Sequence, residues 1–472
     1  MEIIRQENKI LVKGIDPTLR YPWKQQTRKG DQWWGGLVDT YDWPGPFKPM
    51  RHQIETSDFM VFHKRGLVLD DTGTGKTLAT CWSIDRLMHM GLVQNVLILS
   101  PKSTLEVVWY RALWSVFLDR VTIGIKDPEA RICVANPAWL AKVSYPLWDM
   151  IVVDEATCAK NSATQFWKKL NRLSEGKRLM LMTATPTSQG PQDAHGLGRL
   201  IGSIQANKNV WRSTVMLQVG PWKWVPRKNA HEIVSRHLVP SIRHRKADCI
   251  DLPPLVVESR LIALTPEQQK LIKTVLDQLT LQLDQGLKIT MAHEASARQK
   301  LLQILCGFVY DEDHTVHKIP CSRMSVVKEL IDETPDPVLV FFPFVGVADL
   351  VDIGYPYGVI TGDTPMSERL ALIDRFQAGE LKVLFAHPKT IGHGVTLTKG
   401  STVIWYSPVD SSELYYQGVS RLHRQGQTTK VTVFHLESHP VEGEMYRRLQ
   451  MREEMQNVLL DMLTKEGSWK NG

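Results

Sequence analysis

Residues Leu67–Thr77 read Leu-Val-Leu-Asp-Asp-Thr-Gly-Thr-Gly-Lys-Thr and carry the strongest signal in the chain. A short apolar run leads into a glycine-containing turn, and a helical pattern begins directly after Gly-Lys-Thr. Nucleotide-binding α/β proteins use this order of strand, phosphate-binding loop and helix N-terminus. The strict motif has glycine where this chain has Asp70, so a chance Gly-Lys-Thr in a surface loop is the alternative. The flanking strand and helix patterns favour the phosphate loop.

Each residue type in this loop has a chemical use. Glycines at positions 73 and 75 allow backbone N–H groups to turn toward phosphate oxygens. Lys76 is placed to reach the β- and γ-phosphates, and the Thr77 hydroxyl is a ligand for Mg²⁺. We therefore expect ATP and Mg²⁺ to be held by Asp71, Thr72, Gly73, Thr74, Gly75, Lys76 and Thr77.

A second apolar run, Ile151–Val153, ends in the carboxylates Asp154 and Glu155. An NTPase needs one acid near Mg²⁺ and a second acid that polarises the attacking water. A strand that ends in Asp-Glu is by itself usually a solvated edge. Beside a phosphate loop it indicates a Walker B pair, with Asp154 on the metal and Glu155 on the water.

Two arginines of the far half, Arg421 and Arg424, are three residues apart, which places them on one face of a helix. Such a basic face is normally a solvated surface. Phosphoryl transfer, however, needs positive charge on the developing γ-phosphate, and arginine fingers supply it. We predict that both arginines complete the ATP site, which domain motion can then open and close.

These motifs, in this order, resemble helicase superfamily two and specifically its Swi/Snf-type (sucrose non-fermenting) DNA translocases. Residues 70–77 are similar to the family's Asp-Glu-Met-Gly-Leu-Gly-Lys-Thr, and residues 421–427 end in Gly-Gln as that branch does. DEAD-box RNA helicases carry Arg-Thr-Gly-Arg there instead. Arg243–Lys246 with Asp251–Pro254 resembles the passage between lobes. Ile360–Thr364 resembles the second-lobe signature of small annealing-type members.

The resemblance covers residues 46 to 435 and implies an α/β fold with two RecA-like parallel-sheet lobes in tandem. The alternation of strand and helix patterns agrees with such a plan. The expected parts are a Trp-rich N-terminal β element at 1–45, a first lobe at 46–250 with a basic protrusion at 203–246, a second lobe at 251–440 with a helical protrusion at 257–310, and a C-terminal helix at 441–472.

The resemblance also assigns residues outside the core motifs. Gln53 occupies the position that reads the adenine edge, for which an amide has the right donor and acceptor. Gly392 and Gly394 are expected at the nucleotide, although the family's Gly-Gly-x-Gly-x-Asn-Leu is reduced here to Ile391–Leu397. Thr157 stands where the family carries His. The expected contacts to the DNA backbone are Ser100, Lys102, Asn136, Lys223, Arg227, Lys228, Thr361, Lys389 and Thr390. For single strand-end residues, ordinary loop chemistry is the alternative.

Residues 203–246 carry nine basic side chains against one acid, Glu232. A solvated face normally mixes charges of both signs, so this bias favours phosphate contact. The N-terminal tryptophans Trp23, Trp33, Trp34 and Trp43 allow two interpretations. Stacking on unpaired bases is one; packing of a small β meander against the first lobe agrees better with residue-type burial.

Length and composition limit the class of protein to which the chain can belong. A chain of 472 residues predicts two or three domains, and 43% hydrophobic with 23% charged residues is ordinary for a globular protein. No apolar run approaches a membrane span, and the N-terminus is not a signal peptide. Six scattered cysteines predict buried thiols in a reducing compartment. The formal charge of +7 mildly favours an anionic partner.

The sequence therefore predicts an ATP-dependent motor that translocates on double-stranded DNA and displaces or remodels what is bound there, without obligatory strand separation. A strand-separating helicase or RNA remodeller on the same two lobes is the alternative. A non-catalytic nucleic-acid-binding scaffold is disfavoured, because every ATPase position holds a competent residue. We expect a monomer without a membrane partner, in the nucleoid of a prokaryotic or viral setting or in a eukaryotic nucleus.

Overall fold

The computed structural model describes residues 2–6, 9–13, 25–29, 32–38, 41–142, 148–220, 223–284, 291–311, 313, 315–391 and 395–451. The chain divides into two compact units, and the boundary lies between Asp251 and Leu252. We call the unit before this boundary the first lobe, and residues 252–451 the second lobe.

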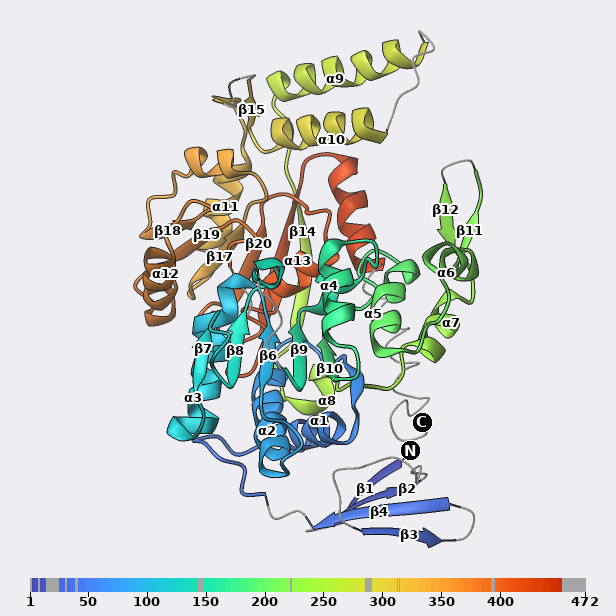
Figure 1. Cartoon of the computed structure of the whole chain (residues 1–472). Coiled ribbons are helices and arrows are strands. Elements are labelled where there is room, and N and C mark those ends of the chain that lie inside the picture. Colours follow the sequence, from blue (N-terminus) through green and yellow to red (C-terminus); the bar gives the residue numbers. More distant parts are fainter. Residues whose placement is uncertain are drawn as a thin grey trace. The chain divides into compact units, whose positions relative to one another are not determined.

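The first lobe is built on a seven-stranded sheet in which every pairing is parallel (Figure 1). Its strand order is β13-β5-β10-β9-β6-β8-β7. The strands are β5 (Arg65–Val68), β6 (Val96–Leu99), β7 (Ile123–Ile125), β8 (Ile132–Ala135), β9 (Met150–Asp154), β10 (Arg178–Met182) and β13 (Ser241–Ile242).

Helices cover both faces of this sheet, which explains why its strands read as continuous apolar runs. Alternate residues of one strand enter two different cores. Ile151 and Val153 pack with α4 (Gln165–Leu173) and α5 (Ala194–Ile201), whereas Val152 packs on the other side. That second core is closed by α1 (Arg51–Phe62), α2 (Lys76–His89) and α3 (Arg111–Phe117).

The second lobe repeats this plan with a six-stranded parallel sheet of order β14-β21-β20-β17-β19-β18. The strands are β14 (Leu255–Leu261), β17 (Val338–Phe341), β18 (Tyr357–Ile360), β19 (Val383–Ala386), β20 (Thr402–Trp405) and β21 (Val431–Glu437). The helices include α11 (Arg323–Asp332), α12 (Met366–Ala378) and α13 (Ser412–Val419). The prediction of two parallel-sheet α/β lobes is thus confirmed.

The helical protrusion of the second lobe begins later than the sequence predicted. Residues 257–261 belong to β14, which pairs along its whole length with β21. The alternation of half-buried and exposed side chains on β14 is the strand pattern that the prediction missed. The helices of the protrusion are α9 (Pro266–Asp284) and α10 (Met291–Leu305), and a hairpin of β15 (Phe308–Tyr310) and β16 (Val316–Lys318) follows them.

The basic segment of the first lobe also differs from its prediction at one end. Its first part forms α6 (Lys208–Val215), a hairpin of β11 (Met216–Gln218) and β12 (Trp224–Pro226), and α7 (Ala230–His237). The last part leaves this protrusion, because β13 joins the central sheet beside β5. Arg243 and Lys246 therefore reach the phosphate loop instead of the protrusion.

At the N-terminus, four strands form an antiparallel sheet of order β1-β2-β4-β3. They are β1 (Glu2–Gln6), β2 (Lys9–Lys13), β3 (Gln25–Lys29) and β4 (Gln32–Val38). Trp43 packs edge-on against Trp82 of α2, which supports packing over base stacking for this ring. Trp23 and the side chains of Trp33 and Trp34 lie outside the described residues.

The C-terminal helix is described over 440–451, and 452–472 lie outside the described residues. Within the described ranges, no helix is long and apolar enough to span a bilayer. The prediction of uniformly buried cysteines is wrong. Cys158 is exposed and Cys249 and Cys321 are half-buried, because these three lie in turns and at helix ends outside the two sheets.

Candidate nucleotide-binding site

The register of the first sheet brings the phosphate loop and the acidic pair to one edge. In the two parallel pairings of β10, Met182 is aligned with Val68 of β5 on one side and with Asp154 of β9 on the other. The loop after β5 and the carboxylate that ends β9 therefore emerge at the carboxyl end of the sheet, one strand apart. Ligands of open α/β sheets bind at this edge.

Two glycines of the loop adopt backbone conformations that other residues avoid. Gly73 has φ +91° and Gly75 has φ +84°, and Gly75 is the residue directly before α2. A Cβ atom on Gly75 would lie 2.1 Å from Nε2 of Gln53. The backbone angle thus favours glycine at position 75, and any Cβ atom there would displace the Gln53 amide.

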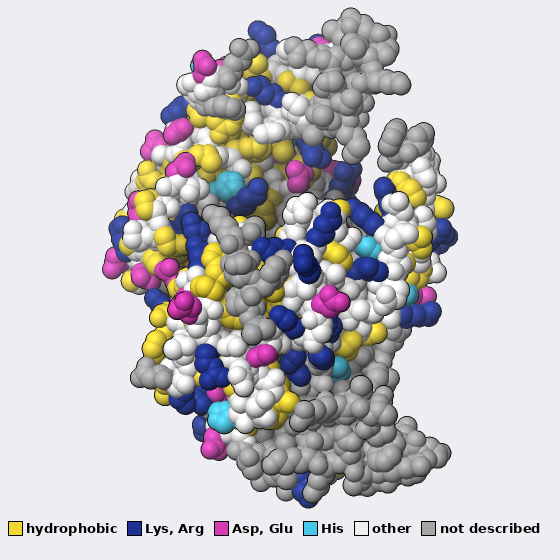
Figure 2. Space-filling model, in the orientation of Figure 1, with side chains coloured by type: hydrophobic (Ala, Val, Ile, Leu, Met, Phe, Trp, Pro, Cys, Tyr) yellow, Lys and Arg dark blue, Asp and Glu magenta, His cyan; other side chains and the backbone are white. Residues whose placement is uncertain are grey.

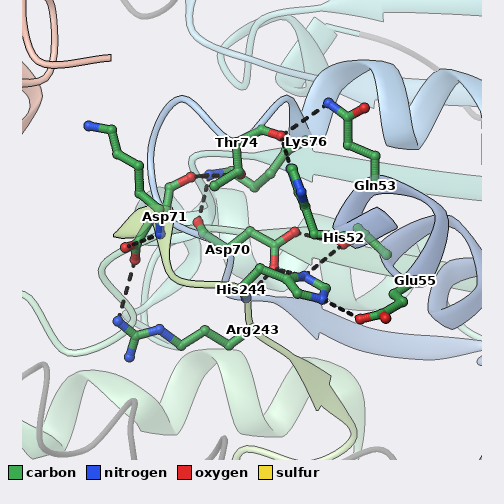
Figure 3. Close-up of polar contacts among 11 residues, drawn as sticks. His52, Gln53, Glu55, Asp70, Asp71, Thr74, Lys76, Arg243 and His244 are labelled. Atoms are coloured by element: carbon green, nitrogen blue, oxygen red, sulfur yellow. Dashed lines mark hydrogen bonds and ion pairs between the residues drawn. The ribbon is translucent and has the colours of Figure 1, made fainter. Parts of the chain in front are cut away.

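Lys76, the first residue of α2, is held by the loop itself. Its ammonium group donates to the carbonyl oxygens of Asp70 at 2.7 Å and Asp71 at 3.0 Å, and the Thr74 hydroxyl also donates to the Asp71 carbonyl (Figure 3). The lysine is therefore positioned against the backbone that the motif assigns to phosphate binding. Thr77 follows in the first turn of α2 and is half-buried.

Helix α1 contacts the loop through two neighbouring side chains. His52 Nε2 lies 2.8 Å from the Thr74 carbonyl oxygen, and Gln53 Nε2 donates to the same oxygen at 3.2 Å. The Gln53 side-chain oxygen accepts the Met50 N–H at 3.0 Å. These bonds use one donor and one acceptor of the amide, and leave one N–H and one lone pair for a base edge.

Asp70, the departure from the strict motif, has a structural explanation. Its carboxylate is buried at 1% exposure and accepts hydrogen bonds from the Thr56 hydroxyl at 2.7 Å and the His244 backbone N–H at 2.8 Å. Asp71 beside it accepts the Lys246 backbone N–H at 3.0 Å and pairs with Arg243 at 3.4 Å. These carboxylates anchor the loop to the segment after β13.

The Walker B acid is oriented by side chains from outside its own strand. Oδ2 of Asp154 accepts the Ser100 hydroxyl and the Trp109 indole N–H, each at 2.8 Å. Oδ1 accepts the Glu155 backbone N–H at 3.1 Å. Glu155 itself has φ +49°, which is uncommon for a residue with a side chain and is typical of functional sites.

Ser100 therefore corrects one prediction. It is fully buried, and its hydroxyl also bonds to Thr104 at 2.7 Å, so it contacts Asp154 and not an external phosphate. The contribution of Trp109 was not predicted at all. Trp109 lies on a π-helix, Leu105–Tyr110, whose wide turns shift the register of a normal helix. A tryptophan eight residues after a strand-ending Ser-Pro was the available signal.

The other predicted DNA contacts of the first lobe differ in exposure. Lys102 is exposed and begins a short 3-10 helix, Lys102–Thr104, after β6, whereas the Asn136 side-chain oxygen accepts the Trp139 N–H at 2.8 Å. On the basic protrusion, Lys223, Arg227 and Lys228 are all exposed. Figure 2 shows Lys and Arg side chains gathered on the face that α4 to α7 occupy in Figure 1.

In the second lobe, the carboxyl ends of β18 and β19 hold three predicted contacts. The Thr361 N–H donates to the Thr364 hydroxyl at 2.9 Å, and Lys389 is exposed. Thr390 is buried at 6% exposure, and its hydroxyl donates to the His387 carbonyl at 2.7 Å. Thr390 therefore braces its own loop through its hydroxyl, and its contact with a DNA phosphate stays a prediction.

The two predicted arginine fingers do not lie on a helix. Helix α13 ends at Val419, and Arg421 and Arg424 follow in consecutive turns because the backbone changes to i→i−3 hydrogen bonds. Arg421 is buried at 2% exposure. Arg424 is half-buried and donates to the Val395 carbonyl at 2.9 Å, and burial lowers its pKa. Gly392 and Gly394 lie outside the described residues.

The donor set fits Mg²⁺. The Thr77 hydroxyl and the Asp154 carboxylate are hard oxygen ligands, which Mg²⁺ prefers, and it commonly uses only one or two of them together with phosphates. No group of three or more His, Cys, Asp or Glu side chains suited to a metal occurs among the described residues, so this chain offers no separate all-protein metal cage there.

Three family models match the chain. The "SNF2-related domain" matches residues 135–307, the "Helicase conserved C-terminal domain" matches 322–426, and the "Type III restriction enzyme, res subunit" matches 47–188. These matches cover both lobes and both sides of the boundary at Asp251.

Curated relatives are similar at low identity over most of the chain. The "ISWI chromatin-remodeling complex ATPase ISW1" of Saccharomyces cerevisiae is 24% identical over 83% of this chain, which spans 38% of that relative. The "Uncharacterized ATP-dependent helicase YqhH" of Bacillus subtilis is 23% identical over 89% of this chain and 81% of its own length. "Putative protein p41" of Acyrthosiphon pisum secondary endosymbiont phage 1 is 22% identical over 89% of this chain and 99% of its own length.

A solved structure, "Sulfolobus solfataricus SWI2/SNF2 ATPase core in complex with dsDNA", is similar with a TM-score of 0.42 and 21% identity, over 88% of this chain and 93% of that one. The family models and the relatives agree with the motifs of the nucleotide site. The family models and the relatives therefore support the assignment of both lobes to the Swi/Snf-type ATPases of helicase superfamily two.

Proposed function

We propose that this chain is an ATP-driven motor that translocates on double-stranded DNA and remodels or displaces the structures and proteins bound to it, without obligatory strand separation. The observation that carries the proposal is that the phosphate loop and both Walker B acids lie at one sheet edge of the first lobe. Lys76 and Thr77 come after β5, Asp154 ends β9, and Glu155 is the next residue.

Each group has a proposed task. Gln53 reads adenine, the loop N–H groups and Lys76 hold the phosphates, and Thr77 with Asp154 holds Mg²⁺. Bound Mg²⁺ neutralises charge on the β- and γ-phosphates. Glu155 orients the attacking water. Arg421 and Arg424 are proposed to stabilise the charge that develops on the γ-phosphate, as arginine fingers do.

The DNA substrate is proposed from charge. Six basic residues lie on the protrusion before β13 against the single acid Glu232, and all six are exposed, among them Lys223, Arg227 and Lys228. A motor that tracks phosphates needs such contacts and needs no access to base edges. The name of the yeast relative refers to chromatin remodelling, which is consistent with displacement of DNA-bound protein. Such a motor would work wherever its DNA is, in a nucleoid or a nucleus.

A strand-separating helicase is the second candidate, because the Bacillus subtilis relative is named an ATP-dependent helicase. Strand separation costs roughly 1.4 kcal/mol per base-pair step and needs a wedge or a stacking platform for the opened strand. Of the N-terminal tryptophans that were candidates for this task, Trp43 packs against Trp82 and Tyr41. This contact removes Trp43 from the candidates for such a platform.

The choice is tested with purified full-length chain and three nucleic acids of equal length. ATP hydrolysis is expected to rise strongly with blunt duplex DNA and less with single-stranded DNA or RNA. The chain is expected to displace a third strand from a duplex with ATP, and to leave a forked duplex intact. Efficient fork unwinding, or stimulation by RNA alone, would support the helicase instead.

Three single variants test the catalytic assignment. Lys76→Ala, Glu155→Gln and Arg424→Ala are each expected to remove most ATP turnover and to leave duplex binding largely intact. Loss of an arginine finger typically costs about 10³-fold or more in rate. Near-normal hydrolysis by the Arg424→Ala variant would exclude this residue as a finger.

A further inference from the structure

His244 occupies an unusual position between β13 and the phosphate loop. The backbone after β13 continues alongside the start of the loop: the Leu69 N–H donates to the Ile242 carbonyl at 2.8 Å, and the Asp71 N–H donates to the His244 carbonyl at 3.1 Å. These backbone hydrogen bonds hold His244 against the loop independently of its side chain.

The imidazole of His244 lies between two carboxylates (Figure 3). Its Nδ1 is 3.0 Å from Oδ1 of Asp70, and its Nε2 is 2.9 Å from Oε2 of Glu55 on α1. The side chain is only 13% exposed, and that of Asp70 is 2% exposed. A doubly protonated ring donates one N–H to each carboxylate, that of the buried Asp70 and that of the half-buried Glu55.

The protonation of the group follows from these contacts. Burial alone would lower the pKa of His244, but the hydrogen bonds to Asp70 and Glu55 outweigh burial and raise this pKa to about 9. The hydrogen bond to His244 lowers the pKa of Glu55 to about 2. At neutral pH the arrangement is thus a cation between two anions.

Other charged and titratable groups surround the cluster of His244, Asp70 and Glu55. His52 of α1 has its ring centre 5.8 Å from that of His244, and Arg51 pairs with Glu55 at 2.9 Å. Cys249 of α8 (Lys246–Cys249) interacts electrostatically with Asp70 and Glu55. Nearby charges also include those of Lys76, Asp71, Arg243, Arg245, Lys246 and Asp248.

The cluster is connected to the catalytic lysine through one residue. The side chain of Asp70 accepts from His244, and the carbonyl oxygen of the same residue accepts the Lys76 ammonium at 2.7 Å. A shift of Asp70 therefore moves a hydrogen-bond partner of Lys76. Seven residues after His244, the chain reaches the boundary of the first lobe at Asp251.

We propose that His244 is a positioning residue for ATP hydrolysis: by holding Asp70 and Glu55 together it sets the conformation of the phosphate loop and of Lys76, and it ties the segment that leads out of the first lobe to that conformation. The proposal rests on the ATPase function proposed above. His244 itself does not contact the reacting atoms; it acts through Asp70.

Two variants of His244 separate charge from shape. Glutamine has a single NH₂ group and no charge, so His244→Gln cannot donate a charged hydrogen bond to each carboxylate. Arginine keeps several donors and remains charged at every accessible pH, so His244→Arg retains both ion pairs at high pH. A matched control is His317→Gln on β16, where Nε2 of an exposed histidine lies 2.7 Å from Oδ2 of Asp311 in the second lobe.

The experiment measures kcat and KM for ATP from about pH 6 to about pH 10 with saturating duplex DNA, and the affinity for a fluorescent ATP analogue without DNA. Thermal melting verifies that each variant is folded. His244→Gln is expected to lower kcat by about tenfold at neutral pH, the order of one lost charge-assisted hydrogen bond, and to weaken analogue binding. His317→Gln is expected to change neither quantity.

The pH profile supplies the readout that a merely structural residue would not move. Wild-type kcat is expected to fall as the pH rises through about 9, the pKa of His244. His244→Arg is expected to restore most of the activity and to lack this alkaline fall. A folded His244→Gln variant with wild-type kcat and profile, or a His244→Arg variant with an unchanged alkaline fall, would overturn the proposal. A wild-type chain that binds the analogue but hydrolyses no ATP would instead contradict the proposed function.

Discussion

The indole N–H of Trp109 donates to Oδ2 of Asp154 at 2.8 Å, and the ring that carries it is completely buried in the first lobe. The Ser100 hydroxyl donates to the same oxygen at 2.8 Å. The carboxylate proposed to hold Mg²⁺ is therefore oriented by the end of β6 and by the π-helix that follows. Partners of this kind fix a metal ligand before the metal binds.

We predict that Trp109→Phe impairs Mg²⁺-dependent hydrolysis without unfolding the lobe. Phenylalanine keeps an apolar ring in the core but removes the N–H that orients Asp154. Loss of such a partner typically costs about 10- to 100-fold in metal affinity or activity. The measurement is ATP turnover as a function of Mg²⁺ concentration at fixed ATP.

The control for this variant is Trp211→Phe. Trp211 is also buried in the first lobe, and its indole nitrogen has no hydrogen-bond partner within the described residues. This control removes the same atoms from a similar environment. Superimposable Mg²⁺ curves for the two variants would show that the bond to Asp154 has no role in metal binding.

A second prediction concerns Gly75→Ala. At φ +84° an alanine is strained by about 1–2 kcal/mol, and its Cβ would lie 2.1 Å from Nε2 of Gln53. We expect loss of most ATP affinity, because either the loop or Gln53 must move. Equilibrium binding of a fluorescent ATP analogue measures this loss.

Gly91→Ala separates strain from contact. Gly91 has φ +68°, and a Cβ atom there meets nothing within 4 Å. This variant is expected to lose stability through the backbone alone and to keep its ATP affinity. If the two variants bound ATP equally well, contact with Gln53 would not be the reason for glycine at position 75.

The strands were predictable because a parallel strand with both faces buried reads as an unbroken apolar run. Met150–Asp154 is such a run, and the polar residues that end it face the ligand edge of any parallel sheet. The positions of the motif residues at these strand ends could therefore be predicted from the sequence, because the apolar residues next to them in the chain mark the strand.

The supporting residues were not predictable in this way. Asp70 and His244 are 174 positions apart, and only the position of β13 beside β5 brings them together. Trp109 depends on a π-helix that no periodicity signalled. The three-residue spacing of Arg421 and Arg424 suggested a helix, but the chain had already left α13 at Val419. In each case, a long-range contact or a backbone irregularity decided the outcome.

A third prediction tests the pH dependence of stability. The folded pKa of His244 is about 9, above its ordinary value of 6.5, so its stabilising effect is complete below 6.5 and is lost as the pH rises through 9. The folded pKa of Glu55 is about 2, so its contribution is present above 4.5 and is lost only as the pH falls toward 2. His244 and Glu55 should therefore stabilise the first lobe most between pH 4.5 and pH 6.5, where both contributions are complete. The stabilisation should be on the order of a few kcal/mol.

The measurement is urea unfolding of the wild type and of His244→Gln at several pH values. The difference in unfolding free energy should be largest near pH 6 and should shrink toward zero above about pH 9. A difference that stays constant over this range would mean that the ionisation of His244 does not contribute to stability.

A fourth prediction concerns the buried ion pair of the second lobe. Arg323 of α11 donates two hydrogen bonds of 2.8 Å to the carboxylate of Glu442, and both side chains are 0% exposed. Arg323→Met is expected to destabilise the second lobe by about 3–5 kcal/mol, because it leaves a buried carboxylate without its cationic partner and, among the described residues, with only the Ser438 N–H as a donor. The double variant Arg323→Met, Glu442→Leu should recover much of this loss. Urea unfolding of the full chain is the measurement. Additive effects in the double variant would contradict the ion pair as the cause.

The last prediction addresses the DNA-facing role of the basic protrusion. Lys223, Arg227 and Lys228 are exposed on or next to β12, and the Arg227 side chain is steadied by a 3.1 Å hydrogen bond to the Ser213 carbonyl. Reversing all three to glutamate should weaken duplex binding. It should also flatten the dependence of log affinity on log salt by roughly 0.9 for each DNA phosphate that the protein no longer neutralises. ATP affinity without DNA should not change, because these residues are not among those at the nucleotide site.

The matched control reverses three exposed lysines of the second lobe that are not predicted to contact DNA: Lys270, Lys328 and Lys430. Both triple variants change the net charge equally, so a general electrostatic effect would reduce affinity and slope in both. Contact between the protrusion and DNA phosphates predicts a flatter slope for the first variant only. Equal slopes for the two variants would mean that the protrusion is a solvated basic surface, and the phosphate contacts of the motor would then have to be sought on Lys102 and Lys389, the remaining exposed candidates.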